Sequence, residues 1–222
     1  AAGFSLGEVP AAAYCGLLGC EDAFRYVVKR GRYMHDAAAE KEGAMAAVVR
    51  LSNSQVEDVC AEFNEMYPVN YNCTGQVAVA GAAGEMDGFI KRITEVGGKA
   101  IRLSVSGAFH SPFMEKASDM LYGELDKLSF FAPKIPLYSN VTAAPLTAEE
   151  APYLMAKQVK SPVMWEKTIL NMLADGADVF IEVGAGKVLG GLIKKIAPQA
   201  EVYSAEKYED IAGLARFGEV RI

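Results

Sequence analysis

Histidine is scarce in this sequence, and its cysteines lack the spacing of a metal site. The 222 residues include two histidines and four cysteines, and no two cysteines form a C-x-x-C pair. Zinc sites need three or four such side chains at short spacings, so we expect no metal site. Cys15 and Cys20 lie in an apolar helical stretch, which favours buried thiols over a disulfide.

Long apolar runs, long runs of one charge sign, low-complexity segments and internal repeats are absent as well. A membrane-spanning helix needs about 20 apolar residues, and a secretory signal peptide has an apolar core of its own. Since we find neither, we expect a soluble, cytoplasmic protein that does not enter membranes. The formal net charge of −6 makes nucleic acid a poor candidate as a partner.

The chain does contain enough apolar residues, 51%, to bury one substantial core. After His110, predicted strands alternate with predicted helices, which is typical of a parallel sheet covered by helices on both faces. Residues 44–105 instead follow the order β-α-β-β-α-β of a ferredoxin-like unit. We therefore predict an α/β domain made of residues 1–43 and 106–222, with residues 44–105 inserted as a ferredoxin-like subdomain.

Several local patterns predict individual elements. Ser54 and Glu57 have the spacing of a capping box, at the start of a helix that extends to about Met66. We also predict a strand over 135–139 and a final helix over 210–217. Residues 21–40 predict a helix with one apolar stripe, made of Phe24, Val27, Val28, Gly31, Met34 and Ala38.

A serine between two glycines opens the chain, in Gly3-Phe4-Ser5-Leu6-Gly7. The pattern G-x-S-x-G is that of a nucleophile elbow, in which glycines permit a strained turn that exposes the serine oxygen. A helix is predicted directly after it, with Pro10 in the first turn, and a helix N-terminus favours an oxyanion. The alternative is a simple turn of small residues before a helix.

A serine nucleophile needs a base, and only two histidines are available. His110 lies in a loop between an apolar strand and a helix, where ligand sites of open α/β sheets collect, so we favour it as a base over a helix cap. His35 lies near the end of a predicted helix, which favours a surface role. No acidic residue stands out to orient the imidazole. A backbone or amide carbonyl could do so instead, because any acceptor suffices.

Arg30 is also unusual, because its helical row is otherwise apolar or aromatic. Its guanidinium either extends past tyrosines to water or pairs with a carboxylate in a cleft, and the pattern leaves both open. A second glycine-rich stretch, Gly184-Ala185-Gly186-Lys187, lies between a predicted strand and a predicted helix. It favours a tight turn over a phosphate cradle, since the P-loop spacing is absent.

Around Ser5, Arg30 and His110, the sequence resembles the malonyl-CoA:acyl carrier protein transacylases, acyltransferases of bacterial fatty-acid synthesis. The resemblance covers nearly the whole chain, and five motifs occur in the family's order. It implies an α/β-hydrolase-like domain with a ferredoxin-like insertion, the organisation predicted above. The five stretches are Phe4-Ser5-Leu6-Gly7-Glu8, Lys29-Arg30-Gly31-Arg32-Tyr33-Met34, Gly107-Ala108-Phe109-His110-Ser111-Pro112-Phe113-Met114, Lys157-Gln158-Val159-Lys160-Ser161-Pro162-Val163 and Glu182-Val183-Gly184-Ala185-Gly186-Lys187-Val188-Leu189.

The resemblance implies a role for each of five residues. Ser5 would attack the malonyl thioester, with His110 as its base. Arg30 would bind the free malonyl carboxylate, and Leu6 would supply an oxyanion-hole N–H. The main-chain carbonyl of Gln158 would orient the imidazole. Malonyl would pass from malonyl-CoA to the serine and then to the phosphopantetheine thiol of acyl carrier protein, without a metal or redox cofactor.

Two departures from the family pattern bear on activity. Phe4 stands where the family usually has histidine, which should alter the pocket wall and leave the chemistry intact. Family members also have a segment ahead of the elbow that supplies a second oxyanion N–H. We therefore expect this chain to be a fragment that lacks the N-terminal segment and is nearly inactive alone, because losing one such donor costs about 10²–10³ in rate.

Two other functions stay open at this point. A serine esterase or thioesterase would share the elbow but release acyl groups to water, although Arg30 and the missing acid argue against it. A catalytically dead acyltransferase-like domain would only dock a carrier protein. An Arg30→Ala change separates an esterase from a transacylase, since only a transacylase should lose its preference for malonyl. A malonyl adduct on Ser5 would exclude a catalytically dead docking domain.

Overall fold

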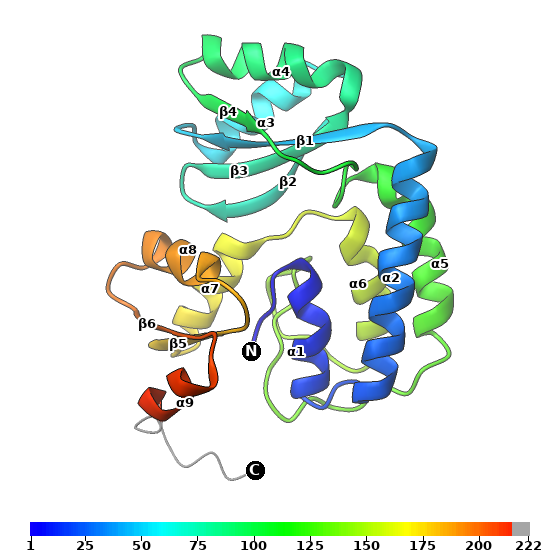
Figure 1. The fold of residues 1–222 in the computed structure, drawn as a ribbon, viewed down its shortest axis with the longest axis vertical. Coiled ribbons are helices and arrows are strands. Elements are labelled where there is room, and N and C mark those ends of the chain that lie inside the picture. Colours follow the sequence, from blue (N-terminus) through cyan, green and yellow to red (C-terminus); the bar gives the residue numbers. More distant parts are fainter. Residues whose placement is uncertain (215–222) are drawn as a thin grey trace. The chain divides into compact units, whose positions relative to one another are not determined.

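The structure, a computed structural model, describes residues 1–214 of the chain (Figure 1). The described residues form two compact units, Ala1–Thr168 and a second unit that begins at Ile169. The predicted limits of the inserted subdomain, residues 44 and 105, both lie inside the first unit and remain a prediction. Among the described residues, no helix is long and apolar enough to cross a membrane.

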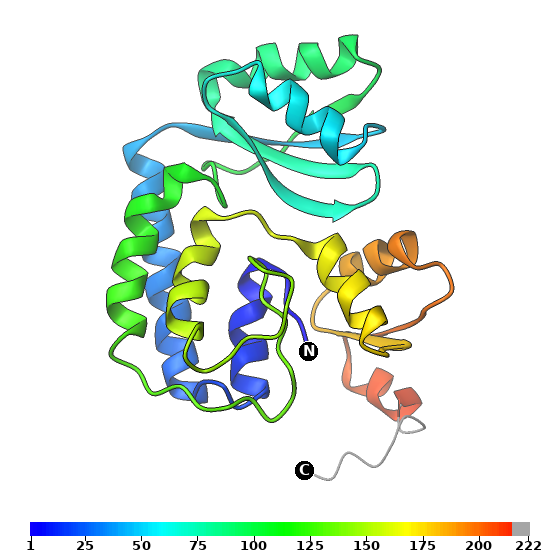
Figure 2. The ribbon, with the colours of Figure 1, turned by 180° about the vertical axis from the view of Figure 1, so that it is seen from behind.

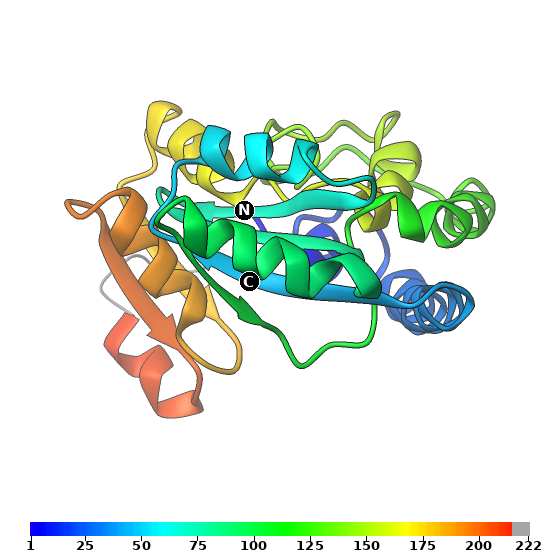
Figure 3. The same cartoon turned by 90° about the horizontal axis from the view of Figure 1, so that it is seen from above.

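The first unit contains a four-stranded antiparallel sheet in the order β2-β3-β1-β4, with two helices over one face (Figures 1 and 3). Along the chain these elements follow the ferredoxin-like order that the sequence predicts. Their bounds are β1 Gly43–Val49, α3 Asn53–Ala61, β2 Met66–Cys73, β3 Gln76–Ala82, α4 Ala83–Glu95 and β4 Lys99–Arg102.

The two faces of this sheet contact different parts of the unit. One face is covered by α3 and α4, and Phe89 of α4 is fully buried there. On the other face Met45 packs with Ala108, which precedes His110 by two positions. A Cβ atom at Gly43 would lie 2.5 Å from the main-chain nitrogen of Ala108, so the two backbones meet closely. The sheet thereby supports the loop that carries His110.

Four helices lie side by side in the rest of this unit and enclose a second core (Figures 1 and 2). Ala12, Leu121 and Met155 are buried in that core, one from each of three helices. Two short 3₁₀ turns, η2 and η3, adjoin these helices. The bounds are α1 Glu8–Tyr14, α2 Cys20–Glu40, η2 Pro112–Met114, α5 Glu115–Leu125, α6 Ala151–Lys157 and η3 Gln158–Lys160.

Helix α2 buries a different face from the predicted one. Phe24 and Val28, both in the predicted stripe, are 70% and 57% exposed. The buried residues of α2 are Ala23, Tyr26, Arg30, Met34 and Ala37, and of these only Met34 belongs to the predicted stripe. Both rows carry apolar side chains at helical spacing, so periodicity alone does not distinguish them. The packing of α2 against α1 and α5 decides which row is covered.

The capping box of α3 lies two residues earlier than predicted, at Ser52 and Gln55 instead of Ser54 and Glu57. Ser52 Oγ accepts a hydrogen bond from the N–H of Gln55 at 3.2 Å, and Gln55 Oε1 accepts one from the N–H of Ser52 at 2.9 Å. Both pairs have the spacing of a capping box, so the pattern fits either start. The helix also ends before Met66, where β2 begins.

The second unit is built around a two-stranded parallel sheet of β5 and β6. The predicted helix over 210–217 begins at Tyr208, and its residues after Leu214 lie outside the described part. Helix α7 begins in the first unit and ends in the second. The bounds are α7 Trp165–Ala174, β5 Val179–Val183, α8 Val188–Ile196, β6 Glu201–Ala205 and α9 Tyr208–Leu214.

The strand predicted over 135–139 is present only as isolated bridges at one residue. Tyr138 pairs in parallel with Ala2 and antiparallel with Pro145. The main-chain N–H of Tyr138 also donates to the carbonyl of Ala1 at 2.9 Å. This pairing fixes the chain just ahead of the glycine–serine turn.

Candidate active site

Ser5 lies on a strained turn. Its φ of 49° is in the left-handed region, which residues with a side chain seldom adopt. The turn η1, Ser5–Gly7, leads directly into α1. A Cβ atom at Gly3 would overlap the main-chain carbon and oxygen of Gly7, so the turn closes tightly on itself. This is the local geometry of a nucleophile elbow.

Ser5, His110 and Gln158 form a hydrogen-bonded series. Ser5 Oγ lies 2.7 Å from His110 Nε2, and His110 Nδ1 lies 2.9 Å from the main-chain oxygen of Gln158. Because a carbonyl oxygen can only accept, Nδ1 carries the proton and donates it. Nε2 is then unprotonated and accepts the hydroxyl proton of Ser5. The arrangement is that of a nucleophile and its base, with a carbonyl as the orienting group.

Hydrogen bonds fix the main chain of His110 as well as its ring. The residue has a φ of 61°, and its N–H donates to the carbonyl of Val159 at 2.9 Å. It is 4% exposed, and burial lowers the pKa of the imidazole to about 4. The ring is therefore neutral near pH 7, which is the form that a base requires. His35, by contrast, is exposed on α2.

Arg30 extends from the buried face of α2 to the same place. Its Nη2 donates to Ser5 Oγ and to Gln158 Oε1, each at 3.0 Å. The residue is 6% exposed, so extension to water, one of the two alternatives from the sequence, is wrong. Among residues 1–214 its guanidinium forms no ion pair, and its buried Nε has no hydrogen-bond partner. Burial lowers the pKa of this cation.

Asn140 completes the turn around Ser5, and nothing in its sequence context indicated it. Its Oδ1 accepts from the N–H of Ser5 at 2.7 Å, and its Nδ2 donates to the carbonyl of Gly3 at 2.6 Å. Its main-chain N–H donates to Glu8 Oε1 at 2.8 Å. Asn140 is fully buried in a loop without periodicity, so only its contacts reveal it.

Glu8 is a second site residue without a predicted role, although it belongs to the elbow motif. It is 1% exposed, and its Oε2 accepts a hydrogen bond from Gln158 Nε2. Burial raises the pKa of this carboxyl to about 7, while the bonds from Asn140 and Gln158 and the charge of Arg30 act in the opposite direction. The carboxyl therefore changes charge near neutral pH.

The other predicted groups lie outside this cluster or remain untested. Leu6 follows Ser5 in η1 with its side chain turned outward, 53% exposed. In the Gly184–Gly186 loop the structure favours the tight turn, since Glu182 accepts the N–H groups of Leu189 and Gly190 at 3.0 and 2.8 Å. Within residues 1–214, no group of three or more histidine, cysteine or acidic side chains could hold a metal ion.

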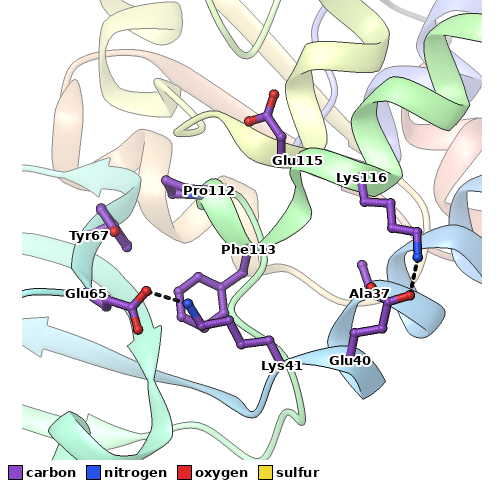
Figure 4. Close-up of a pocket in the computed structure, with 9 residues that line it drawn as sticks. All are labelled: Ala37, Glu40, Lys41, Glu65, Tyr67, Pro112, Phe113, Glu115 and Lys116. Carbon is purple, nitrogen blue, oxygen red and sulfur yellow. Dashed lines mark hydrogen bonds and ion pairs between the residues drawn. The ribbon is translucent and has the colours of Figure 1, made fainter.

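A pocket of about 270 Å³ lies where the end of α2, β2 and η2 meet (Figure 4). The Phe113 ring lines it, with Lys41 Nζ 4.0 Å above the ring centre. Lys41 pairs with Glu65, and Lys116 pairs with Glu40. Ser5, Arg30 and Gln158 do not line it, and its two lysines are already paired.

The family model described as acyl transferase domain matches residues 1–213. The chain belongs to this acyltransferase family. Because the match spans both compact units, the serine cluster and the β5–β6 unit are parts of one acyltransferase chain.

Among the acyltransferases similar to this chain, a malonyl CoA-acyl carrier protein transacylase of Bacillus subtilis is 38% identical over 216 residues, which are 95% of this chain and 68% of the relative. The solved transacylase of Clostridium perfringens superposes with a TM-score of 0.93 at 34% identity, over 97% of this chain and 70% of that one. A malonyl-transacylase solved in complex with its type II PKS acyl-carrier protein matches with a TM-score of 0.94 at 29% identity, over 98% and 72%. The fold is therefore that of an acyltransferase.

Proposed function

We propose that this acyltransferase moves malonyl from malonyl-CoA to the phosphopantetheine thiol of acyl carrier protein, through a malonyl ester on Ser5. One observation carries the proposal: the buried guanidinium of Arg30, which forms no ion pair within the described part of the chain, donates to the Oγ atom of the nucleophile at 3.0 Å. A short acyl group that ends in a carboxylate would supply a direct ion-pair partner. The names of its relatives support the same substrates.

In the first half-reaction, Ser5 Oγ attacks the carbonyl carbon of the malonyl thioester while His110 Nε2 takes the hydroxyl proton. The main-chain N–H of Leu6 would donate to the oxyanion that forms. The tetrahedral intermediate then breaks its C–S bond, and the proton on Nε2 passes to the departing coenzyme A thiolate. The carbonyl of Gln158 stabilises the transient imidazolium through Nδ1.

The second half-reaction reverses the roles. His110 Nε2 takes the proton of the phosphopantetheine thiol, and the thiolate attacks the ester carbonyl on Ser5. The C–O bond breaks, and the proton returns to Ser5 Oγ. The scheme uses no metal and no redox cofactor. The cytoplasmic location expected from the sequence is part of the same proposal.

Arg30 would discriminate among acyl groups. A carboxylate binds a guanidinium through two parallel hydrogen bonds, and the buried Nε of Arg30 has no hydrogen-bond partner among residues 1–214. An acetyl group would leave this cation unpaired in a buried site, which raises the free energy of the acetyl complex. Malonyl and similar carboxyacyl groups are therefore the proposed substrate class.

The test is intact-mass spectrometry of the chain after mixing with malonyl-CoA. A malonyl adduct on the wild type that is lost in Ser5→Ala supports the proposal. Ser118→Ala, a change of another buried serine in α5, serves as the matched control and should keep the adduct. No adduct on the wild type would favour a docking domain, and release of malonate to water with no transfer to carrier thiol would favour an esterase.

A further inference from the structure

Outside the Ser5–His110 pair, the most unusual group near the site is the carboxyl of Glu8. It is 1% exposed and has no ion pair among the described residues. Its hydrogen bonds within residues 1–214 go to Asn140 and Gln158 and to neither Ser5 Oγ nor His110, so the proposed steps do not use it. Burying such a group costs free energy that only its hydrogen bonds and nearby charges offset.

The two oxygens of Glu8 accept from two different segments. Oε1 accepts from the main-chain N–H of Asn140 at 2.8 Å, and Oε2 accepts from Gln158 Nε2. The same Nε2 also donates to the main-chain oxygen of Ser5 at 2.8 Å. Both hydrogens of the Gln158 amide are therefore committed to acceptors on the elbow side.

This pairing decides which way the Gln158 amide faces. Because the Ser5 carbonyl can only accept, the NH₂ group must point toward it, and Oε1 must point away. The carboxylate form of Glu8, which also can only accept, favours the same orientation. Gln158 Oε1 then accepts a hydrogen bond from Arg30 Nη2 at 3.0 Å. The same Nη2 is also 3.0 Å from Ser5 Oγ. An amide in the opposite orientation would present NH₂ to the guanidinium and repel it.

We propose that Glu8 is a positioning residue, whose carboxylate holds the Gln158 amide with its oxygen toward Arg30 and so keeps the guanidinium where it selects carboxylate-bearing acyl groups. The inference rests on the proposed function for its substrate class. The orientation of the amide, however, can be observed without turnover.

The central variant is Glu8→Gln. A glutamine that accepts from the Asn140 N–H presents its own NH₂ to Gln158, where two donors then face each other. Gln158 relieves this by rotating its amide, and Arg30 loses its acceptor. We expect the ratio of Ser5 loading rates from malonyl-CoA and acetyl-CoA to fall about 10-fold or more, the effect of one lost charge-assisted hydrogen bond. A merely structural role would slow both donors equally.

A second variant, Gln158→Leu, removes the side-chain amide and keeps the main-chain oxygen that binds His110. It should lower the malonyl-to-acetyl loading ratio as well. The ratio in the double variant, Glu8→Gln with Gln158→Leu, should be no lower than in the more affected single variant, because both changes act through one amide. Glu182→Gln is the matched control, since that carboxylate also accepts two N–H groups, and the ratio should not change. If Glu8→Gln does not fold, an unchanged ratio in Gln158→Leu overturns the proposal.

Crystal structures of the wild type and Glu8→Gln separate this proposal from the proposed function. A rotated amide with loss of the Arg30–Gln158 contact supports the positioning role even if no malonyl adduct forms. An unchanged contact, or an equal loss of malonyl and acetyl loading, overturns it.

Discussion

Asn140 Oδ1 accepts a hydrogen bond from the main-chain N–H of Ser5 at 2.7 Å, across 135 positions of sequence. Its Nδ2 donates to the carbonyl of Gly3, so one side chain holds the backbone on both sides of Phe4. The left-handed φ of Ser5 is unfavourable for a residue with a side chain and persists only where its surroundings enforce it. Asn140 is a main source of that enforcement.

Replacing Asn140 by alanine should therefore loosen the elbow. Two buried hydrogen bonds are lost and their backbone partners are left without replacements, so the free energy of unfolding should fall by about 2–4 kcal/mol. Urea denaturation measures the change, and the rate of Ser5 acylation should fall with it. Asn64→Ala removes an exposed asparagine and should cost less than about 0.5 kcal/mol. Equal losses in the two variants would contradict this account.

The two glycines of the elbow should respond differently to alanine. A Cβ atom at Gly3 would overlap the main chain of Gly7, whereas a Cβ atom at Gly7 would meet nothing within 4 Å. Gly3→Ala should therefore destabilise the fold by about 3 kcal/mol or more, as expected where backbone must move. Gly7→Ala should change stability by less than about 1 kcal/mol, because its φ of −62° suits alanine. Thermal unfolding of both variants tests the contrast.

Substitution of Arg30 should change selectivity more than stability. Arg30→Ala should reduce malonyl loading of Ser5 about 10²-fold or more while acetyl loading falls less, because only malonyl uses the guanidinium. Arg30→Lys keeps the charge without the planar fork and should give an intermediate ratio. Arg32→Ala, an exposed arginine on the same helix, is the matched control. A malonyl-to-acetyl ratio that stays unchanged in Arg30→Ala would remove Arg30 from the selectivity mechanism.

The pH dependence of Ser5 loading should reflect the buried base. His110 must be neutral to take the proton, and burial lowers its pKa from 6.5 to about 4. The value of kcat/KM should therefore persist below pH 6 and be lost as pH falls toward 4. The carboxyl of Glu8 also titrates near pH 7, so the same pH profile is measured in Glu8→Gln, where this titration is absent. An acidic limb near pH 6.5 in both proteins would contradict the assignment of a buried, neutral base.

Some of this site could be predicted from sequence because its signals are local. The spacing of glycines around Ser5 predicts a strained turn, and the helix that follows at Glu8 confirms that geometry. Likewise, the alternation between residues 44 and 105 predicts the β-α-β-β-α-β order. Such patterns depend on neighbours within a few positions, which a sequence displays directly.

Other features of the structure depend on packing, and local sequence patterns do not predict them. The exposed Phe24 and Val28 fit the helical stripe as well as the buried Tyr26 does, so only the helices packed against α2 distinguish them. Similarly, Asn140 lies in a loop with no periodic pattern. Nothing near it in the sequence indicates that its amide reaches Ser5.

The sequence by itself determined most of the elements, the strained serine turn and the family motifs, because these reside in residues close together along the chain. The family resemblance implied that His110 and Gln158 act with Ser5, but only the tertiary structure showed that they and Asn140 converge on it, from 105, 153 and 135 positions away. The tertiary structure also decided that Arg30 is buried beside the nucleophile and that Glu8 holds the Gln158 amide. Hydrogen bonds across such separations depend on how the helices and loops pack, which no local pattern encodes.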